Sequence, residues 1–505
     1  MTAMKRTLSI LIALLTAASA FAACGEKAPD TAAPSAGAAE IETADENAGQ
    51  AETTEVPAEY KAPDANYNGE VFTFLDYDTE DWFWRAASYS DIRAEEQNGD
   101  PINDAQYKRN LAVEELLGVK IETVKADSVD RQINGQMLDK FIAAGDASID
   151  AAFVFGMNFA SLMSDAGKLQ NLLGLDTLNV SSSWWNQNFV SEMTLRGTLK
   201  GVTGSISIFN SFAPELYFFN KNMAESFGIN DLYSLADSGQ WTFDKAVEYS
   251  GLVASDIDGD GKMTENDRFG TAIQPALVLD CVLACGERLT KKDGDSIELA
   301  LNTPRTAQIV EKVVPYLNDK HINAVTSMFS GYSNVFRQVH IPLFMNDQIL
   351  FNFNQLLISI ELRDMEADFG LLPLPKLDES QPEYHTFGSP WWDTILVVPA
   401  MNARHEITGH IFDALGYYSQ QLVIPAFIDQ TVSNKALRDE DSARMLNIVL
   451  GSQVYDIGYF YGWGDLAGML NGLGSSNKTD FASAYAKVES KALAAMEKTL
   501  ADLEG

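Results

Sequence analysis

The chain has 505 residues, of which 46% are hydrophobic, and it carries a formal net charge of −35. Such an acidic excess argues against nucleic acid as a partner, because nucleic-acid recognition depends on clustered lysine and arginine. The length exceeds the usual size of a single hydrophobic core, so we expect two lobes or domains.

The first two dozen residues have the pattern of a secretory signal. Lys5 and Arg6 precede an apolar run from Leu8 to Ala18, and small residues then lead to Cys24. A basic start, a short apolar run and small residues before a cleavage point are typical of such signals. The run is shorter than the roughly 20 residues of a membrane-spanning helix. We therefore expect residues 1–23 to be removed as a signal peptide.

The residues just before Cys24 resemble a lipobox. The resemblance implies that Cys24 is acylated, with palmitate as a typical chain, and becomes the first residue of a mature protein held at the extracellular face of the cell membrane. Phe21 departs from the pattern, which prefers leucine or another aliphatic residue three positions before the cysteine. Ordinary signal cleavage, with Cys24 an incidental residue, is the alternative.

The segment 24–65 has the composition of a flexible tether. Between Gly25 and Asp64 it contains ten acidic and two basic residues, and its first aromatic residue is Tyr60. A segment of this kind buries too little apolar surface to offset the loss of chain entropy, so we expect it to be disordered. A charged spacer after an anchoring cysteine would let a folded domain reach clear of the bilayer.

The elements that follow alternate between strands and helices. Strands are expected at 71–75, 119–124 and 149–155, with helices at 104–117 and 133–144 that end at Gly118 and Gly145. Gly156 is expected in a turn. This alternation is typical of a doubly wound α/β lobe. Further strands are expected at 216–219 and 394–398, with an extended passage at 370–375, and helices at 404–419, 439–449 and 481–503.

An acidic loop in the middle of the chain matches the twelve-residue calcium loop of an EF-hand. Its candidate ligands occupy the loop's first, third, fifth, seventh, ninth and twelfth positions, and these are Asp256, Asp258, Asp260, the carbonyl of Lys262, Thr264 and Asp267. Gly261 permits the sharp turn. Asp267 replaces the usual glutamate, and the next residues are expected to be extended rather than helical. We expect a structural Ca²⁺ site, with a solvated acidic turn as the alternative.

Paired tryptophans are the candidate ligand contacts. Flat aromatic surfaces cover the apolar faces of sugar rings, while polar neighbours bind the hydroxyl groups. Because adjacent tryptophans often point in opposite directions, one member of each pair is open to a role in the core. Trp241 and Trp463 are interpreted as packing residues. The candidate contacts are Trp82 and Trp84, Trp184 and Trp185, and Trp391 and Trp392 with Asp393.

The remaining cysteines and histidines indicate no metal or redox site. Cys281 and Cys285 lie four residues apart in an expected helix, a spacing more typical of buried thiols than of a disulfide. His405 and His410 do not have the spacing of a zinc-protease helix.

Several passages, taken in order, resemble the extracellular solute-binding proteins of family 1, the receptors of ABC sugar importers. They are Phe218–Lys221, Gly228–Ile229, Gln240–Phe243, Gly370–Pro375 and Val397–Pro399. A narrower set resembles the large clostridial-type members: Asn103–Ala105, Arg109–Asn110, Val113–Glu115, Trp184–Trp185, Arg438–Glu440 and Tyr455–Gly458.

The resemblance implies a type II periplasmic-binding-protein-like α/β fold with two lobes, each a doubly wound sheet with flanking helices. Crossover hinge strands would join lobe one, residues 66–165 and 352–418, to lobe two, residues 166–351 and 419–505. It also implies a monomer, without enzymatic activity, that delivers a carbohydrate or oligosaccharide to ABC permease subunits. A peptide or another polar solute remains open as the ligand.

Two other functions remain open. One is an extracellular carbohydrate-active hydrolase, since 71 acidic residues make paired carboxylates easy to find. However, nucleophile-elbow, Walker A and zinc-protease patterns are absent from the sequence. The other is a ligand-sensing lipoprotein coupled to a membrane kinase.

Overall fold

A computed structural model describes residues 60–77, 89–126, 131–163, 165, 167–432 and 440–503. The signal, Cys24, most of the tether and the pair Trp82 and Trp84 lie outside these residues. All described residues belong to one unit, 57–505. In the described part of the chain, no helix is both long and apolar enough to cross a bilayer.

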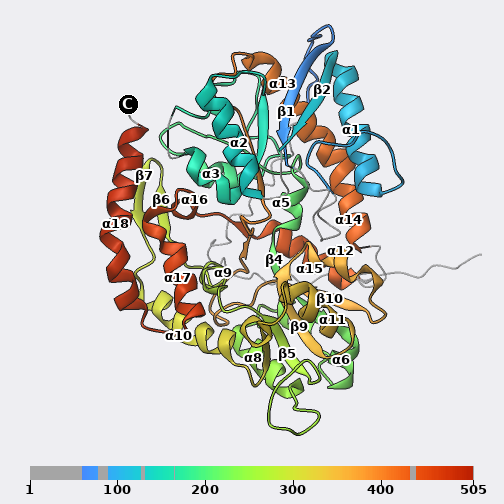
Figure 1. Cartoon of the computed structure of the whole chain (residues 1–505), viewed down its shortest axis with the longest axis vertical. Helices are drawn as coiled ribbons and strands as arrows, with labels where there is room; N and C mark the ends of the chain where they lie inside the picture. The colour runs from blue at the N-terminus through green and yellow to red at the C-terminus, as the bar shows by residue number, and fades with distance from the viewer. Residues whose placement is uncertain are drawn as a thin grey trace, which may run out of the picture. The chain divides into compact units, whose positions relative to one another are not determined.

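A four-stranded sheet is built mainly from the N-terminal part of the chain (Figure 1). Its strands are, in spatial order, β12 (Thr394–Val397), β3 (Ala151–Phe155), β1 (Glu70–Asp76) and β2 (Val119–Lys125). β1 runs parallel to β2 and β3, whereas β12 returns antiparallel to β3. The strands expected from alternation near 71, 119 and 149 are confirmed, and the chain's last strand of this sheet comes from far downstream.

A five-stranded sheet holds the second group of strands. Its spatial order is β10 (Phe369–Leu372), β4 (Glu215–Asn220), β9 (Ile349–Gln355), β5 (Phe269–Ile273) and β8 (Asn323–Val325). β5 is parallel to β8 and β9, while β4 is antiparallel to both of its neighbours. Several of these strands are buried along their whole length, as expected for a sheet covered on both faces.

Helices cover both sheets. On the first sheet they are α1 (Pro101–Leu117), α2 (Arg131–Ala144), α3 (Gly156–Met163), α13 (His405–Tyr418) and α14 (Ile424–Val432), with α13 and α14 packed against α1. Around the second they include α8 (Phe243–Val253), α9 (Val278–Ala284), α10 (Pro304–Asn318) and α15 (Glu440–Gly451). The C-terminal helices are α16 (Ile457–Phe460), α17 (Leu466–Ser475) and α18 (Phe481–Asp502); α17 and α18 lie against each other and against α10 (Figure 1).

The helix boundaries follow local capping chemistry. Asp100 accepts the backbone N–H groups of Ile102 and Asn103 and so begins α1 three residues before the expected start, with Pro101 at its first position. Gly118 ends this helix in the left-handed conformation, as expected. Gly156 begins α3 rather than forming a turn.

The expected lobe boundaries differ from the strand pairing. β10 and the last four residues of β9 fall within 352–418, the second segment expected for lobe one, yet both strands belong to the five-stranded sheet. Conversely, Val202 bridges Leu396 of β12 and Leu169 bridges Pro399, so much of the segment after 166 lies with the first sheet. Both differences have one cause, because antiparallel pairing joins segments that are distant in the sequence and leaves no local pattern to mark the partner.

Cys281 in α9 and Cys285, which caps the C-terminal end of this helix, are both buried and free. The interpretation of this pair as buried thiols is confirmed. Burial raises the pKa of the Cys281 thiol well above its usual value, so this group stays protonated and unreactive near neutral pH.

Gly270 in β5 and Gly251 in α8 differ in the space that is available for an added methyl group. A Cβ at Gly270 in β5 would lie 2.2 Å from the Cβ and 2.6 Å from the carbonyl oxygen of Ser250 in α8, whereas a Cβ at Gly251 would meet nothing within 4 Å. We expect Gly270→Ala to lower the free energy of unfolding by about 1–3 kcal/mol, because backbone atoms must move. Gly251→Ala should raise it by about 0.5–1 kcal/mol through helix propensity. Melting temperatures of the two variants check the signs; equal values would contradict the close packing of β5 on α8.

Candidate functional site

A cavity of about 570 Å³ lies at the carboxyl ends of β5 and β9. Gln274 directly follows β5, Asn354 and Gln355 end β9, and Glu215 begins β4, which runs antiparallel to β9 and therefore starts at the same edge. In open α/β sheets, ligands bind at this edge, beyond the ends of the strands. The sheet thus delivers polar side chains from three strands to one place.

Backbone hydrogen bonds bring a loop of the other sheet to the same edge. Pro214 bridges Gly388, the N–H of Ser389 donates to the carbonyl of Ala213 at 3.0 Å, and the N–H of Leu356 donates to the carbonyl of Pro214 at 2.8 Å. We call this set of contacts the Pro214 junction. It ties β4 and β9 to the loop that leads into β12. The cavity wall therefore contains residues next to both sheets.

Aromatic side chains form one part of the wall. Trp391 is 51% exposed, although it is one of the largest apolar side chains in the protein, while Trp392 is buried and stacks on Phe209 with ring centroids 6.2 Å apart. Phe336, Phe387 and Tyr459 also line the cavity. Of the pair predicted from the sequence, Trp391 therefore offers an open face, and Trp392 fixes the loop to the core with one edge at the cavity.

Amide and carboxyl groups form the polar part of the wall. Five amide side chains can donate and accept hydrogen bonds there: Gln274, Asn334, Asn354, Gln355 and Asn471. Glu215 and Asp280, from β4 and the first turn of α9, supply two carboxyl groups. Burial, and then the nearby Asp280, raise the pKa of Glu215 well above its usual value, and burial raises the pKa of Asp280 to about 7.

The structure places Trp184 and Trp185 away from this cavity. Both are buried, and their indole N–H groups donate to the same carboxylate oxygen of Asp413 in α13, at 3.2 and 3.3 Å. Tyr60 and Tyr417 pack against the Trp184 ring. These contacts correct the prediction that the pair binds ligand. The two indoles attach the segment after α3 to the first sheet's helices.

Asp393 is also a buried structural residue rather than a group in the cavity wall. One carboxylate oxygen accepts from the amide of Asn210 at 3.1 Å, and its backbone carbonyl accepts the N–H of Gly156. Burial raises its pKa to about 7, against the lowering effect of the Asn210 hydrogen bond. Asp393 therefore holds the loop before β12 and is not among the residues that line the cavity. Trp241, interpreted as a packing residue, is fully buried in the second sheet's core, as is Trp463 between the C-terminal helices.

The sequence interpretation missed the polar half of the site. The strand at 216–219 was expected, but nothing local showed that its first residue, Glu215, would meet the ends of β5 and β9. Asp280, Asn354, Gln355 and Tyr459 were likewise unmarked. The available signal was the position of Asn354 and Gln355 at the end of an apolar strand, since strand ends carry ligand groups in such folds.

The acidic loop between α8 and β5 gathers its first three aspartates. Oxygens of Asp256, Asp258 and Asp260 lie within 4.8 Å of one another. Backbone N–H groups of Gly259 and Gly261 donate to the two oxygens of Asp256, each at 2.7 Å, so the loop curls around this side chain. Such a concentration of carboxylate oxygens is the donor set that Ca²⁺ prefers.

Asp267 lies apart from that group. One of its oxygens accepts the N–H of Ile257 at 2.8 Å, and the other accepts the N–H and hydroxyl of Thr264. Burial would raise the pKa of Asp267, but these backbone hydrogen bonds outweigh it and hold the pKa below the usual value. Asp267 therefore closes the loop. The flank that follows is β5, so the expectation of an extended rather than helical flank is confirmed.

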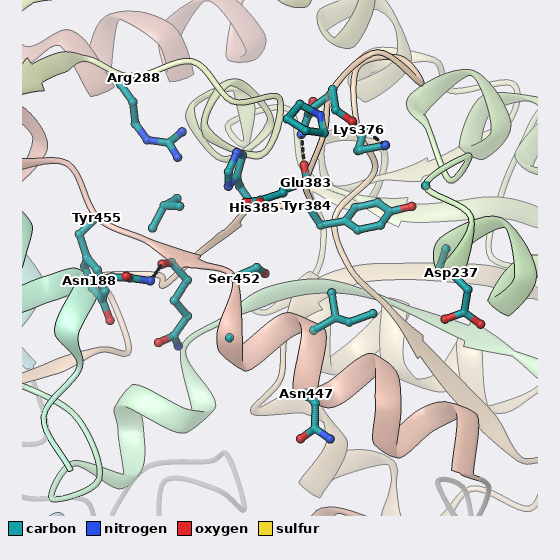
Figure 2. Close-up of a pocket in the computed structure, with 18 of the residues that line it drawn as sticks. Asn188, Asp237, Arg288, Lys376, Glu383, Tyr384, His385, Asn447, Ser452 and Tyr455 are labelled. Atoms are coloured by element: carbon teal, nitrogen blue, oxygen red, sulfur yellow. Dashed lines mark hydrogen bonds between the residues drawn. The ribbon is translucent and has the colours of Figure 1, made fainter. Parts of the chain in front are cut away.

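A second, wider cavity of about 1000 Å³ lies beside α15 and the loop after β10 (Figure 2). Its wall is polar and carries both signs of charge, with Arg288 and Lys376 as bases and Asp237 and Glu383 among the acids. Its described lining residues include no tryptophan, and Lys376 already donates to the carbonyl of Gln381 at 2.7 Å. The cavity at the ends of β5 and β9 is therefore the stronger candidate for a ligand site.

No protein-family model matches the chain, and no similar protein is found among curated proteins. Solved structures are similar at low identity. A cyclo/maltodextrin-binding protein complexed with maltotetraose is 13% identical, with a TM-score of 0.53 over 86% of this chain and 97% of its own. The galacto-N-biose-/lacto-N-biose I-binding protein of an ABC transporter from Bifidobacterium longum, in complex with lacto-N-biose, is 13% identical, with a TM-score of 0.54 over 87% and 98%.

A third similar structure is UgpB from Mycobacterium tuberculosis in complex with glycerophosphocholine. It is 16% identical, with a TM-score of 0.53 over 80% of this chain and 98% of its own. At these identities the likeness establishes the fold. The two sheets with their helices form the two-lobed α/β fold of solute-binding proteins, which confirms the fold class expected from the sequence.

The raised pKa of Asp280 makes the protein's stability depend on pH. The folded protein keeps this proton up to about pH 7, whereas the unfolded chain loses it near its usual value of 3.8. Stability should therefore fall as the pH rises between these values, and the penalty is complete above pH 7. Asp280→Asn removes the charge, so the variant's gain in melting temperature over the native protein should be larger at pH 8 than at pH 4.5, by the equivalent of about 1 kcal/mol or more.

Glu383→Gln is the matched control, because it removes an exposed carboxyl from the other cavity. Its effect on the melting temperature should be nearly the same at both pH values. A gain for Asp280→Asn that does not change with pH would show that this carboxyl is hydrated in the folded protein.

Proposed function

We propose that this protein is an extracellular solute-binding protein that captures a carbohydrate or oligosaccharide and delivers it to an ABC importer by closure of its two lobes. The observation that carries the proposal is the cavity at the carboxyl ends of β5 and β9. It combines the exposed face of Trp391 with five amide side chains. A sugar needs both kinds of group, because its rings present apolar C–H faces and its edges present hydroxyl groups.

The position of the cavity also supports the proposal. Its wall includes the strand ends of one sheet and the loop that leads into the other, so a bound ligand would contact both sides and favour their approach. Binding energy that differs between two arrangements shifts their populations. Two of the solved structures that share the fold hold maltotetraose and lacto-N-biose, which agrees with a carbohydrate here.

A hydrolase is the less favoured alternative. Glu215 and Asp280 form a carboxyl pair, but glycoside hydrolysis requires one carboxylic acid and one carboxylate held in different states. Burial raises the pKa of both groups, and no basic side chain among the described lining residues favours ionisation of either. This symmetry suits binding better than acid–base chemistry. A sensor coupled to a membrane kinase would use the same cavity and would differ only in its partner.

The proposal places the protein at the outer face of the membrane. The signal-like segment, Cys24 with its lipobox-like context and the acidic tether support a lipid-anchored monomer beside its permease. Replacing Cys24 by serine should release the protein into the medium in the native host, as measured by the immunoblot ratio of medium to membrane. Membrane retention of the variant equal to that of the native protein would contradict anchoring through Cys24.

The ligand prediction concerns Trp391. In a calorimetric screen of mono- and oligosaccharides, we expect at least one to bind, and Trp391→Ala to weaken that binding about tenfold, since a stacking aromatic contributes about 1 kcal/mol or more. Leu493→Ala is the control, because Leu493 is also exposed but lies on α18 outside the cavity. Equal affinity of the Trp391 variant and the control would place the sugar elsewhere, and binding of peptides alone would refute the carbohydrate ligand.

We further propose that the loop 256–267 binds a structural Ca²⁺ through Asp256, Asp258, Asp260, the carbonyl of Lys262 and Thr264, with Asp267 closing the loop. Calcium should raise the melting temperature by a few degrees and chelation should lower it, because an ion at a hundred times its dissociation constant adds roughly 2.7 kcal/mol. The double substitution Asp258→Asn and Asp260→Asn should abolish both effects. Asp176→Asn, an exposed aspartate outside the loop, should leave them intact. Absence of any calcium or chelator effect on the native protein would exclude the site.

A further inference from the structure

Among the described residues that line the cavity, acidic side chains are present and basic ones are absent. Glu215 and Asp280 both line the cavity, and the described residues around them include no lysine, arginine or histidine. Glu215 is 1% exposed and Asp280 is 6% exposed, so water screens neither carboxyl strongly. Two buried acidic groups thus face a common space without an opposite charge from the protein.

The Glu215 carboxyl has one oxygen that is able to accept a further hydrogen bond. One of its oxygens accepts from the amide of Gln355, and its other oxygen, Oε2, is buried and has no hydrogen-bond partner among the described residues. Glu215 stands at the first position of β4, directly after the Pro214 junction, so its main chain is held at the edge of the cavity. A buried acceptor without a partner costs about 1–3 kcal/mol, and more when it is charged. A bound ligand that donates to Oε2 recovers that cost.

The kind of donor follows from the energetics of burial. A neutral hydroxyl group can donate one hydrogen bond to Oε2, but it cannot compensate the negative charge that either carboxyl carries once it ionises. The penalty for a buried ion is several kcal/mol and is offset only by a close opposite charge with additional hydrogen bonds. An alkylammonium group provides one positive charge and three N–H donors on a small centre. It matches two neighbouring carboxyl groups better than a hydroxyl group does.

The rest of the wall matches a sugar that carries such a group. Trp391 offers a flat face, and a cation next to an aromatic ring gains further electrostatic stabilisation. The amides of Asn354 and Gln355, at the end of β9, can serve the hydroxyl groups beside the amine. A simple organic cation would leave these amides unused.

We propose that the ligand is an amino sugar, or an oligosaccharide containing one, whose protonated amino group binds between Glu215 and Asp280. This inference rests on the proposed function and narrows its substrate class. It assigns Glu215 as the residue that determines specificity for the charged sugar, with Asp280 as the second carboxyl and Trp391 as the face for the ring.

The protonation states of the two carboxyl groups agree with this assignment. Burial raises the pKa of both carboxyl groups, so the empty cavity retains protons near neutral pH. When the ammonium group enters, one carboxyl proton leaves to solvent, and the positive charge of the ligand takes its place. The net charge buried in the cavity then changes little. A neutral sugar requires no such release.

The test compares matched ligands by titration calorimetry at pH 7.5. The probes are glucosamine, galactosamine and mannosamine, their parent hexoses, their N-acetyl derivatives, and β-1,4-linked tetramers of glucosamine, N-acetylglucosamine and glucose. We expect at least one amine to bind ten or more times tighter than its hydroxyl and N-acetyl counterparts. Glu215→Gln keeps the shape but removes the charge, and should reduce that preference below about threefold. Glu383→Gln, which removes a carboxyl from the other cavity, should preserve it.

Asp280→Asn serves as a second variant if Glu215→Gln does not fold, as judged by its melting curve. Tight binding of a neutral sugar with no preference for its amine would overturn the amino-sugar assignment and leave the carbohydrate-binding function intact. A preference that survives in both variants would also overturn it. Binding of choline in preference to every hexosamine would refute the N–H donor argument, and failure of every carbohydrate would refute the proposed function as well.

Discussion

The arrangement of the molecule depends on a few backbone hydrogen bonds at the Pro214 junction. At this point the start of β4, the residue after β9 and the loop before β12 are joined through Ala213, Pro214, Leu356 and Ser389. Because these are main-chain contacts, they fix position more firmly than side-chain contacts do. They hold the main chain of Glu215 and Gln355 beside the loop that carries Trp391. The candidate site is therefore a consequence of how the two sheets are joined.

Much of the fold could be predicted because its local signals are strong. A short apolar run predicted β1, alternating apolar residues predicted β2, and Gly118 predicted the end of α1. The division of the chain between the two sheets could not be predicted in the same way. β9 and β10 resemble any short buried strand, and their place beside β4 is fixed by antiparallel pairing over more than a hundred residues. Such pairing depends on the packing of the whole sheet, which no window of sequence contains.

The residues of the candidate site likewise fall into those that could be predicted from the sequence and those that only the structure reveals. Trp391 could be predicted because adjacent tryptophans offer flat faces for sugar rings, and the structure leaves this one 51% exposed. The same reasoning selected Trp184 and Trp185, but Asp413 on α13 supplies an acceptor for both indoles and makes them core residues. Glu215 and Asp280 were two acids among 71, and only tertiary structure distinguishes them by burying them together. Sequence composition indicates the kind of ligand, while burial identifies the residues.

The cavity also draws its wall from widely separated parts of the chain, from Glu215 on β4 to Tyr459 on α16 and Asn471 on α17. During synthesis, β4 and β5 are made well before these helices, and until the helices arrive the edge that carries Glu215 and Asp280 stays open to water. Hydrated carboxyl groups ionise at little cost. The free-energy cost of burying the two acids together therefore arises only when the last helices pack against the sheet. The wall of the cavity is therefore complete only when α16 and α17 have packed against the rest of the chain.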